Sequence, residues 1–117
     1  MSESIVAGRA FYFALDILFL YKEMRNQKEY IISKQLIRSA TSIGANIEEA
    51  TAASSRKDFA FKMSIASKEA RETRYWLKLL QASDIIKDYD FSKLISENTE
   101  IIRMLTTIVK TIQMDNN

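Results

Sequence analysis

The sequence predicts an all-α protein, an antiparallel up-and-down bundle of four helices, and three observations support this. The chain of 117 residues has no proline and two glycines, so it is poor in the residues that tight turns require. Apolar residues recur at alternating steps of three and four, which keeps one face of a helix against a partner. Short polar stretches separate the helical segments. The length fits a single domain over residues 1–117.

The first helix is expected over residues 4–25, and its apolar side chains cover nearly every direction around the axis. A bundle helix normally buries a single stripe, so we interpret the excess as a surface for self-association. A wider intramolecular core is the alternative. The apolar run over residues 10–21 is interrupted by Asp16 and is shorter than the ~20 residues that span a bilayer, so no membrane segment is expected.

The second helix is expected over residues 33–52 and has an apolar stripe at heptad spacing. The stripe consists of Leu36, Ala40, Ile43, Ile47 and Ala50. Small residues surround it, and Gly44 within a helix costs about 1 kcal/mol relative to alanine. We interpret Gly44 as a point of close contact with a neighbouring helix. Close approach of the backbone to a ligand is the alternative.

The third helix is expected over residues 55–82 and the fourth over residues 91–113. Ser55 and Asp58 have the spacing of a capping box at the start of the third helix. The core stripe of the third helix consists of Phe59, Met63, Ala66, Ala70, Thr73, Leu77 and Leu80. That of the fourth consists of Leu94, Asn98, Ile101, Leu105, Ile108 and Ile112.

A second stripe on the third helix places Glu72 among the apolar residues Phe61, Ile65, Trp76 and Leu79. An unpaired carboxylate there would be costly, so Glu72 is expected to have a partner. Arg38 lies level with it in an antiparallel pair of helices. Asn46 and Glu49, one turn apart on the second helix, are candidates for the same network. Such networks fix helix pairing more often than they perform chemistry.

Positive charge is concentrated in the third helix, because residues 54–83 carry seven Lys or Arg and three acids. Four of these cations line one side of the helix beside Tyr75: Lys68, Arg71, Arg74 and Lys78. Cations interleaved with an aromatic ring can follow a phosphate backbone and stack on bases. The alternative is a solvated face on which Glu69 and Glu72 supply local ion pairs.

Several classes of function lack their residues in this chain. There is no cysteine and no histidine, which removes thiolate metal sites, disulfides and the commonest general base. A di-iron carboxylate bundle would need Glu-x-x-His motifs. Nucleotide-binding, nucleophile-elbow and zinc motifs are absent. We therefore expect neither an enzyme nor a cofactor or metal site. The N-terminal residues do not have the pattern of a signal peptide, and a cytoplasmic location is expected.

The segments QLIRSATSIGANIEEA and SRKDFAFKMSIASKEARETRYWLKLL resemble the four helix bundle protein family named for proteins encoded in intervening sequences of bacterial 23S rRNA. The family pattern Q-L-x-R-[AS]-x-x-S-I-x-A-N-I-x-E is matched by Gln35, Leu36, Arg38, Ser42, Ile43, Ala45, Asn46, Ile47 and Glu49. Glu72 matches the acidic residue of the third helix. Many members have Pro in place of Gly44 and Gly in place of Ala50.

This resemblance implies a short up-and-down bundle that commonly assembles into a ring-like homopentamer. The family includes accessory proteins of diversity-generating retroelements, which look like positively charged rings that engage nucleic acid and a reverse transcriptase. Most members have no established biochemical role.

The leading hypothesis is a non-enzymatic, cytoplasmic, homo-oligomeric ring of bundles that binds RNA or DNA through Lys68, Arg71, Arg74 and Lys78. Arg38, Asn46, Glu49 and Glu72 would hold the bundle or its interface. The alternative is an adaptor or scaffold with no nucleic-acid role, whose first helix docks another protein. A carboxylate–metal enzyme is a third, less favoured hypothesis.

Overall fold

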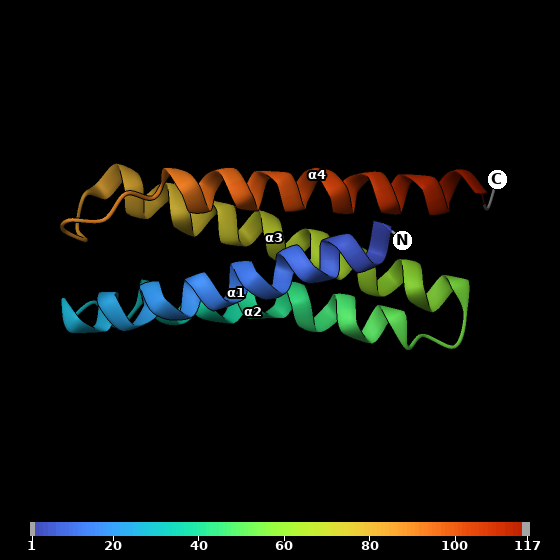
Figure 1. Ribbon diagram of the computed structural model, residues 1–117, viewed down its shortest axis with the longest axis horizontal. Coiled ribbons are helices and arrows are strands. Elements are labelled where there is room, and N and C mark those ends of the chain that lie inside the picture. Colours follow the sequence, from blue (N-terminus) through green and yellow to red (C-terminus); the bar gives the residue numbers. More distant parts are fainter. Residues whose placement is uncertain (1, 116–117) are drawn as a thin grey trace.

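A computed structural model describes the backbone of residues 2–115 and the side chains of residues 5–114, and it shows four α-helices packed in sequence order (Figure 1). They are α1 (Ser2–Asn26), α2 (Ile32–Thr51), α3 (Arg56–Ser83) and α4 (Ser92–Asp115). Consecutive helices run in opposite directions (Figure 1), and the bundle measures 48 × 21 × 21 Å. The prediction of an all-α four-helix bundle is confirmed, and each helix end lies within two residues of its expected position.

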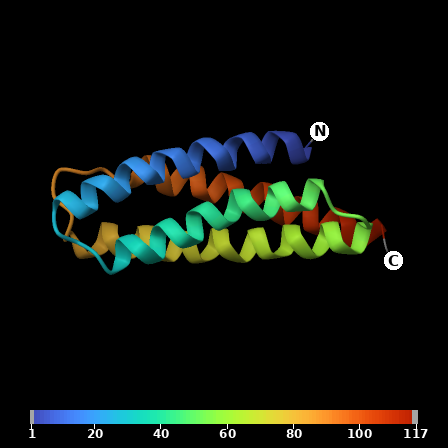
Figure 2. The same cartoon turned by 90° about the horizontal axis from the view of Figure 1, so that it is seen from below.

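The four helices occupy the corners of a square. Each helix packs against its neighbours in the sequence, and α1 also packs against α4, which closes the bundle. Among the described residues the backbones of α1 and α3 do not approach each other closely, and the two helices lie at opposite edges of the bundle (Figure 2). The outer faces of α1 and α3 therefore point in opposite directions.

Each helix contributes one stripe to the core, and for α2, α3 and α4 this is the stripe that the heptad spacing predicted. The expected stripes of the second and fourth helices are fully buried, and so is that of the third helix except for Phe59, which is half-buried. On α1 the buried residues are Val6, Ala10, Phe13, Ile17, Leu20 and Met24. The remaining apolar residues of α1 stay largely exposed, so the core does not widen to include them.

Local hydrogen bonds fix the ends of the helices. The Ser55 hydroxyl accepts a hydrogen bond from the Asp58 backbone N–H at 3.0 Å, so Ser55 caps α3 as predicted. The Glu29 carboxylate accepts from three backbone N–H groups at the start of α2, those of residues 31–33. The Gln27 amide exchanges two hydrogen bonds with the backbone of Lys87, which ties the loop after α1 to the loop before α4.

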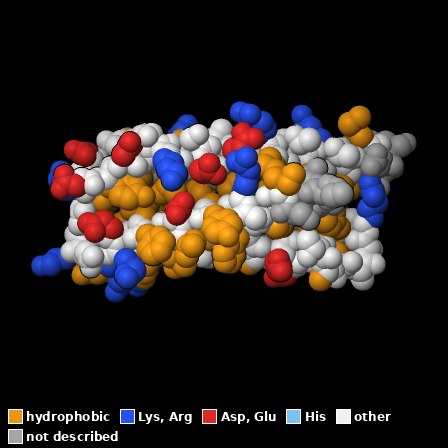
Figure 3. Space-filling model, in the orientation of Figure 1, with side chains coloured by type: hydrophobic (Ala, Val, Ile, Leu, Met, Phe, Trp, Pro, Cys, Tyr) orange, Lys and Arg blue, Asp and Glu red, His pale blue; other side chains and the backbone are white. Residues whose placement is uncertain are grey.

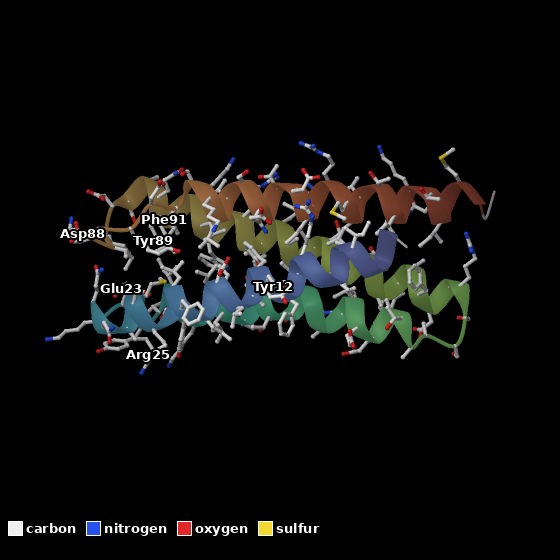
Figure 4. The ribbon with its side chains drawn as sticks, in the orientation of Figure 1. Tyr12, Glu23, Arg25, Asp88, Tyr89 and Phe91 are labelled. Atoms are coloured by element: carbon white, nitrogen blue, oxygen red, sulfur yellow. The ribbon has the colours of Figure 1, made fainter. Side chains whose placement is uncertain are left out.

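The same end of the bundle is closed by two aromatic rings. Tyr89 and Phe91 lie in the loop between α3 and α4 with ring centroids 4.7 Å apart, between α1 and α4 (Figure 4). Phe91 is buried in the core.

Gly44 faces Ala10 where α1 and α2 pack together. A Cβ atom added to Gly44 would lie 3.8 Å from the Ala10 Cβ atom, which is an ordinary van der Waals distance. The φ angle of Gly44 is not positive, so its backbone conformation also suits an L-residue. Gly44 therefore lies at a contact between α1 and α2, as interpreted from the sequence, but this contact leaves room for a Cβ atom and does not require glycine.

We predict that Gly44→Ala stabilises the folded chain, by about 0.5–1 kcal/mol, because alanine loses less backbone entropy in a helix. Urea unfolding monitored by circular dichroism measures the difference. The control is Ala45→Gly at the neighbouring exposed position, which should lower the stability by a similar amount. A Gly44→Ala variant less stable than the parent would contradict the prediction and point to a contact at this position that one chain does not contain.

Candidate nucleic-acid interface

Four cations lie along one side of α3: Lys68, Arg71, Arg74 and Lys78, which we call the basic ridge. Lys68, Arg71 and Lys78 are exposed, and Arg74 is half-buried. Arg71 Nη2 donates a hydrogen bond to the neutral Thr106 hydroxyl of α4 at 3.2 Å. Within the part of the chain that the structure describes, no carboxylate forms a salt bridge with any of the four. None of the four cations is thus paired with an acidic side chain of the described residues.

The carboxylates of the two acids in the middle of α3 are directed toward α2. Arg38 Nη1 lies 3.1 Å from Glu69 Oε2, and Arg38 Nη2 donates to Glu72 Oε2. We call this arrangement the Arg38 clamp. The structure thus places Glu72 against the partner that the antiparallel register predicted, and adds Glu69. Because Arg38 engages both carboxylates, Glu69 and Glu72 do not supply the local ion pairs that the alternative of a solvated face included.

The Arg38 clamp lies nearer to solvent than the sequence suggested. The side chain of Glu72 is 37% exposed and that of Arg38 is 49% exposed, so the expectation of a buried stripe around Glu72 was wrong. The stripe lies at the rim of the α2–α3 interface, where Trp76 is half-buried and Phe61 is 61% exposed.

The environment of Glu72 stabilises its charged form. The Trp76 indole N–H donates to Glu72 Oε2 at 3.1 Å, and this bond, followed by the Arg38 guanidinium, lowers the pKa of Glu72 below its ordinary value. Glu72 therefore stays ionised and holds Arg38 on the α2 side of α3.

The other two expected network residues make separate contacts. Asn46 Nδ2 donates to the Ser42 carbonyl oxygen within α2 at 2.8 Å. Glu49 pairs with Lys62 of α3 at 2.7 Å, which raises the pKa of that lysine. The structure therefore does not bring Asn46 or Glu49 to the Arg38 clamp. Glu49 instead forms a second link between α2 and α3, near the opposite end of this helix pair.

Two exposed aromatic rings on α3 extend the candidate interface beyond the basic ridge. Tyr75 is 60% exposed, and its ring meets the Trp76 ring edge-on with centroids 5.1 Å apart. Phe61 was assigned to a buried stripe from the sequence, so its place on this surface was missed. The available signal was the spacing of Phe61, Lys68 and Tyr75, which are seven residues apart and share one direction on a helix.

The outer face of α1 is the other large apolar surface. The exposed side chains there are Ile5, Phe11, Tyr12, Leu15, Leu18 and Phe19, which we call the α1 face. Hydrophobic side chains gather along this side of the bundle in Figure 3, and Tyr12 projects from the middle of α1 in Figure 4. This cluster is larger than the scattered apolar residues of an ordinary surface.

The structure also bears on metal binding and on membranes. Among the side chains of residues 5–114 it brings together no group of three or more acidic side chains suited to hold a metal ion. None of the described helices combines the length and the apolar character needed to cross a bilayer.

Comparisons with known proteins identify related chains. The model of a family described as 23S rRNA-intervening sequence protein matches residues 2–107. A solved structure from Bacteroides thetaiotaomicron, described as a protein of unknown function from the S23 ribosomal protein family, is 45% identical, with a TM-score of 0.88. That similarity covers 94% of this chain and 99% of the other. No curated protein sequence matches the chain.

The lowered pKa of Glu72 predicts how the Arg38 clamp depends on pH. A carboxylate whose pKa is lower in the folded chain stabilises the fold above its unfolded pKa of about 4.3, and this contribution disappears as the pH falls through the folded pKa. We expect the parent to be more stable than Glu72→Gln near about pH 6, by less than about 1 kcal/mol because the pair is partly exposed. The difference should shrink toward about pH 3. Urea unfolding at each pH measures it.

Glu48→Gln is the matched control, because Glu48 is an exposed carboxylate on the same helix as Arg38. It should show no comparable difference between the two pH values. If the difference in the free energy of unfolding between the parent and Glu72→Gln stays constant with pH, the charge of Glu72 does not hold Arg38.

Proposed function

The chain belongs to the 23S rRNA-intervening sequence protein family, and we propose on that premise that it is a non-enzymatic, homo-oligomeric protein that binds RNA or DNA through the basic ridge. One observation carries the proposal. The Arg38 clamp turns Glu69 and Glu72 away from the ridge, so Lys68, Arg71, Arg74 and Lys78 have no acidic partner among the described residues. Phosphate groups are the ligands complementary to such a row of cations. We also propose that the protein is cytoplasmic.

Assembly would strengthen this binding. Each phosphate neutralised by Lys or Arg releases condensed counterions, so affinity rises with the number of contacts and falls steeply with salt. One ridge supplies at most a few contacts. Several copies arranged by symmetry would present several ridges, and a polyanion that engages one of them would reach the next at a high effective concentration.

The α1 face supports self-association. It exposes several large apolar side chains, and burying them against another copy would remove that area from water. Because α1 and α3 lie at opposite corners of the bundle, an interface on α1 leaves the basic ridge accessible. Subunit assembly and nucleic-acid binding can therefore use different faces of the same chain.

The α1 face also favours the second candidate function, an adaptor that docks a different protein. The two functions differ in the state of the purified chain. An adaptor would be a monomer with an open α1 face, whereas the proposed binder is a closed oligomer in which other copies cover that face. The molar mass in solution separates them.

We predict that the triple variant Lys68→Gln, Arg71→Gln, Lys78→Gln binds nucleic acid more weakly than the parent. The slope of log affinity against log salt should fall by about one for each lost phosphate contact per chain. Fluorescence anisotropy with a structured RNA and a duplex DNA at several salt concentrations measures both quantities. Lys22→Gln, Lys34→Gln, Lys110→Gln removes the same charge from exposed positions on the other helices and is the control. Equal losses in both variants would show that net charge, and not the basic ridge, determines binding.

We also predict that the parent is an oligomer and that Phe19→Glu on the α1 face shifts it toward the monomer. A charge placed at the centre of an apolar interface must be desolvated, which costs several kcal/mol in each contact. Light scattering coupled to size exclusion gives the mass. Ile85→Glu, at an exposed apolar residue in the loop between α3 and α4, is the control and should leave the mass unchanged. A monomeric parent would reject the assembly and favour the adaptor.

A further inference from the structure

We infer that the ligand of the basic ridge is a single-stranded nucleic acid that lies along α3 with bases stacked on Phe61 and Tyr75. This inference rests on the proposed function and narrows it from nucleic acid in general to unpaired strands. It depends on the exposed aromatic side chains of α3, which phosphate binding alone does not explain.

The outer face of α3 carries two parallel lines of side chains. Phe61, Lys68 and Tyr75 form one line, seven residues apart, and all three are exposed. Arg71 and Lys78 form a second line with the same spacing, three residues further along. From Phe61 to Tyr75 the helix rises about 21 Å, the length of about six nucleotides at the ~3.4 Å rise of a stacked strand. Aromatic rings and cations thus alternate over the length of a short oligonucleotide.

This alternation matches a single strand better than a duplex. In a duplex the base faces are covered by their neighbours, and only base edges and phosphates reach a protein surface. Major-groove helices meet base edges with polar side chains such as Arg, Asn and Gln, whereas the first line on α3 has Phe and Tyr at two of its three positions. An unpaired base offers its whole face to a ring, and such stacking tolerates any sequence.

The Phe61 ring is exposed, and the surroundings of the Tyr75 ring leave it free to stack. The one ring contact that Tyr75 makes among the described residues is edge-on with Trp76, so one face of the Tyr75 ring is not covered by it. The Trp76 indole is fixed by its hydrogen bond to Glu72. The chain has one tryptophan, so a base stacked on Tyr75 would lie close to the sole indole and quench its fluorescence.

The full chain is titrated with oligo-dT and with duplex DNA of mixed sequence. Each is about 20 nucleotides long, which exceeds the ~4–16 nucleotides that one OB fold binds. Anisotropy of the labelled DNA gives the affinity, and Trp76 emission is recorded in the same titration. We expect oligo-dT to bind more tightly than the duplex and to quench Trp76. Phe61→Leu and Tyr75→Leu, which keep apolar bulk and remove the ring, should each weaken oligo-dT binding by at least about fivefold. Duplex binding should change little.

Tyr75→Phe keeps the ring and should bind oligo-dT like the parent, which separates stacking from general damage to α3. Tyr30→Leu removes an exposed ring from the loop between α1 and α2 and should have no effect. Equal or tighter binding to the duplex, with no effect of either leucine variant, would overturn this inference and leave the proposed function standing. Failure of both DNAs to bind at low salt would overturn both. A change in molar mass in Phe61→Leu or Tyr75→Leu would overturn the inference by making this face a subunit interface.

Discussion

The structure depends on a core that admits one narrow stripe from each helix and no ionisable side chain among the described residues. Its buried polar residues are neutral: Ser33, Ser39, Thr73 and Asn98. Asn98 donates to the Ala70 carbonyl oxygen at 3.1 Å and interrupts the apolar stripe of α4, a position at which a polar residue fixes helix register at some cost in stability. All described charges therefore lie on or near the outer surface, and the binding chemistry of this chain is a property of its faces.

Among those surface charges, the Arg38 clamp determines which side of α3 is positive. A partly exposed ion pair contributes little to stability, so the larger consequence of this contact is the arrangement of charge. Arg38 binds both Glu69 and Glu72 from the α2 side, and none of the cations of the basic ridge forms a salt bridge with these two acids. The net charge of the whole chain is only +2, but the field that a ligand meets at α3 is that of an unpaired basic row.

The sequence predicted the features that depend on period and register, and it missed those that depend on distance from neighbours. Heptad spacing was enough to identify the buried stripes of α2, α3 and α4, and antiparallel register was enough to place Arg38 opposite Glu72. The exposure of Phe61 and Glu72 depends on how closely α2 approaches the rim of α3, which a periodic pattern does not encode. The partners of Asn46 and Glu49 depend on side-chain conformation. The spare room at Gly44 depends on the separation of α1 and α2.

The stiffness of the nucleic acid relates assembly through the α1 face to binding at the basic ridge. If copies assemble through α1, their ridges lie on the far sides of neighbouring bundles, each about 21 Å across. Duplex DNA has a persistence length of about 50 nm and would have to bend sharply to follow several such ridges, at a cost of several kcal/mol. A single strand bends within a few nucleotides and can pass from one ridge to the next without that cost. The geometry that makes assembly useful for binding therefore also favours unpaired strands, independently of base stacking on Phe61 and Tyr75.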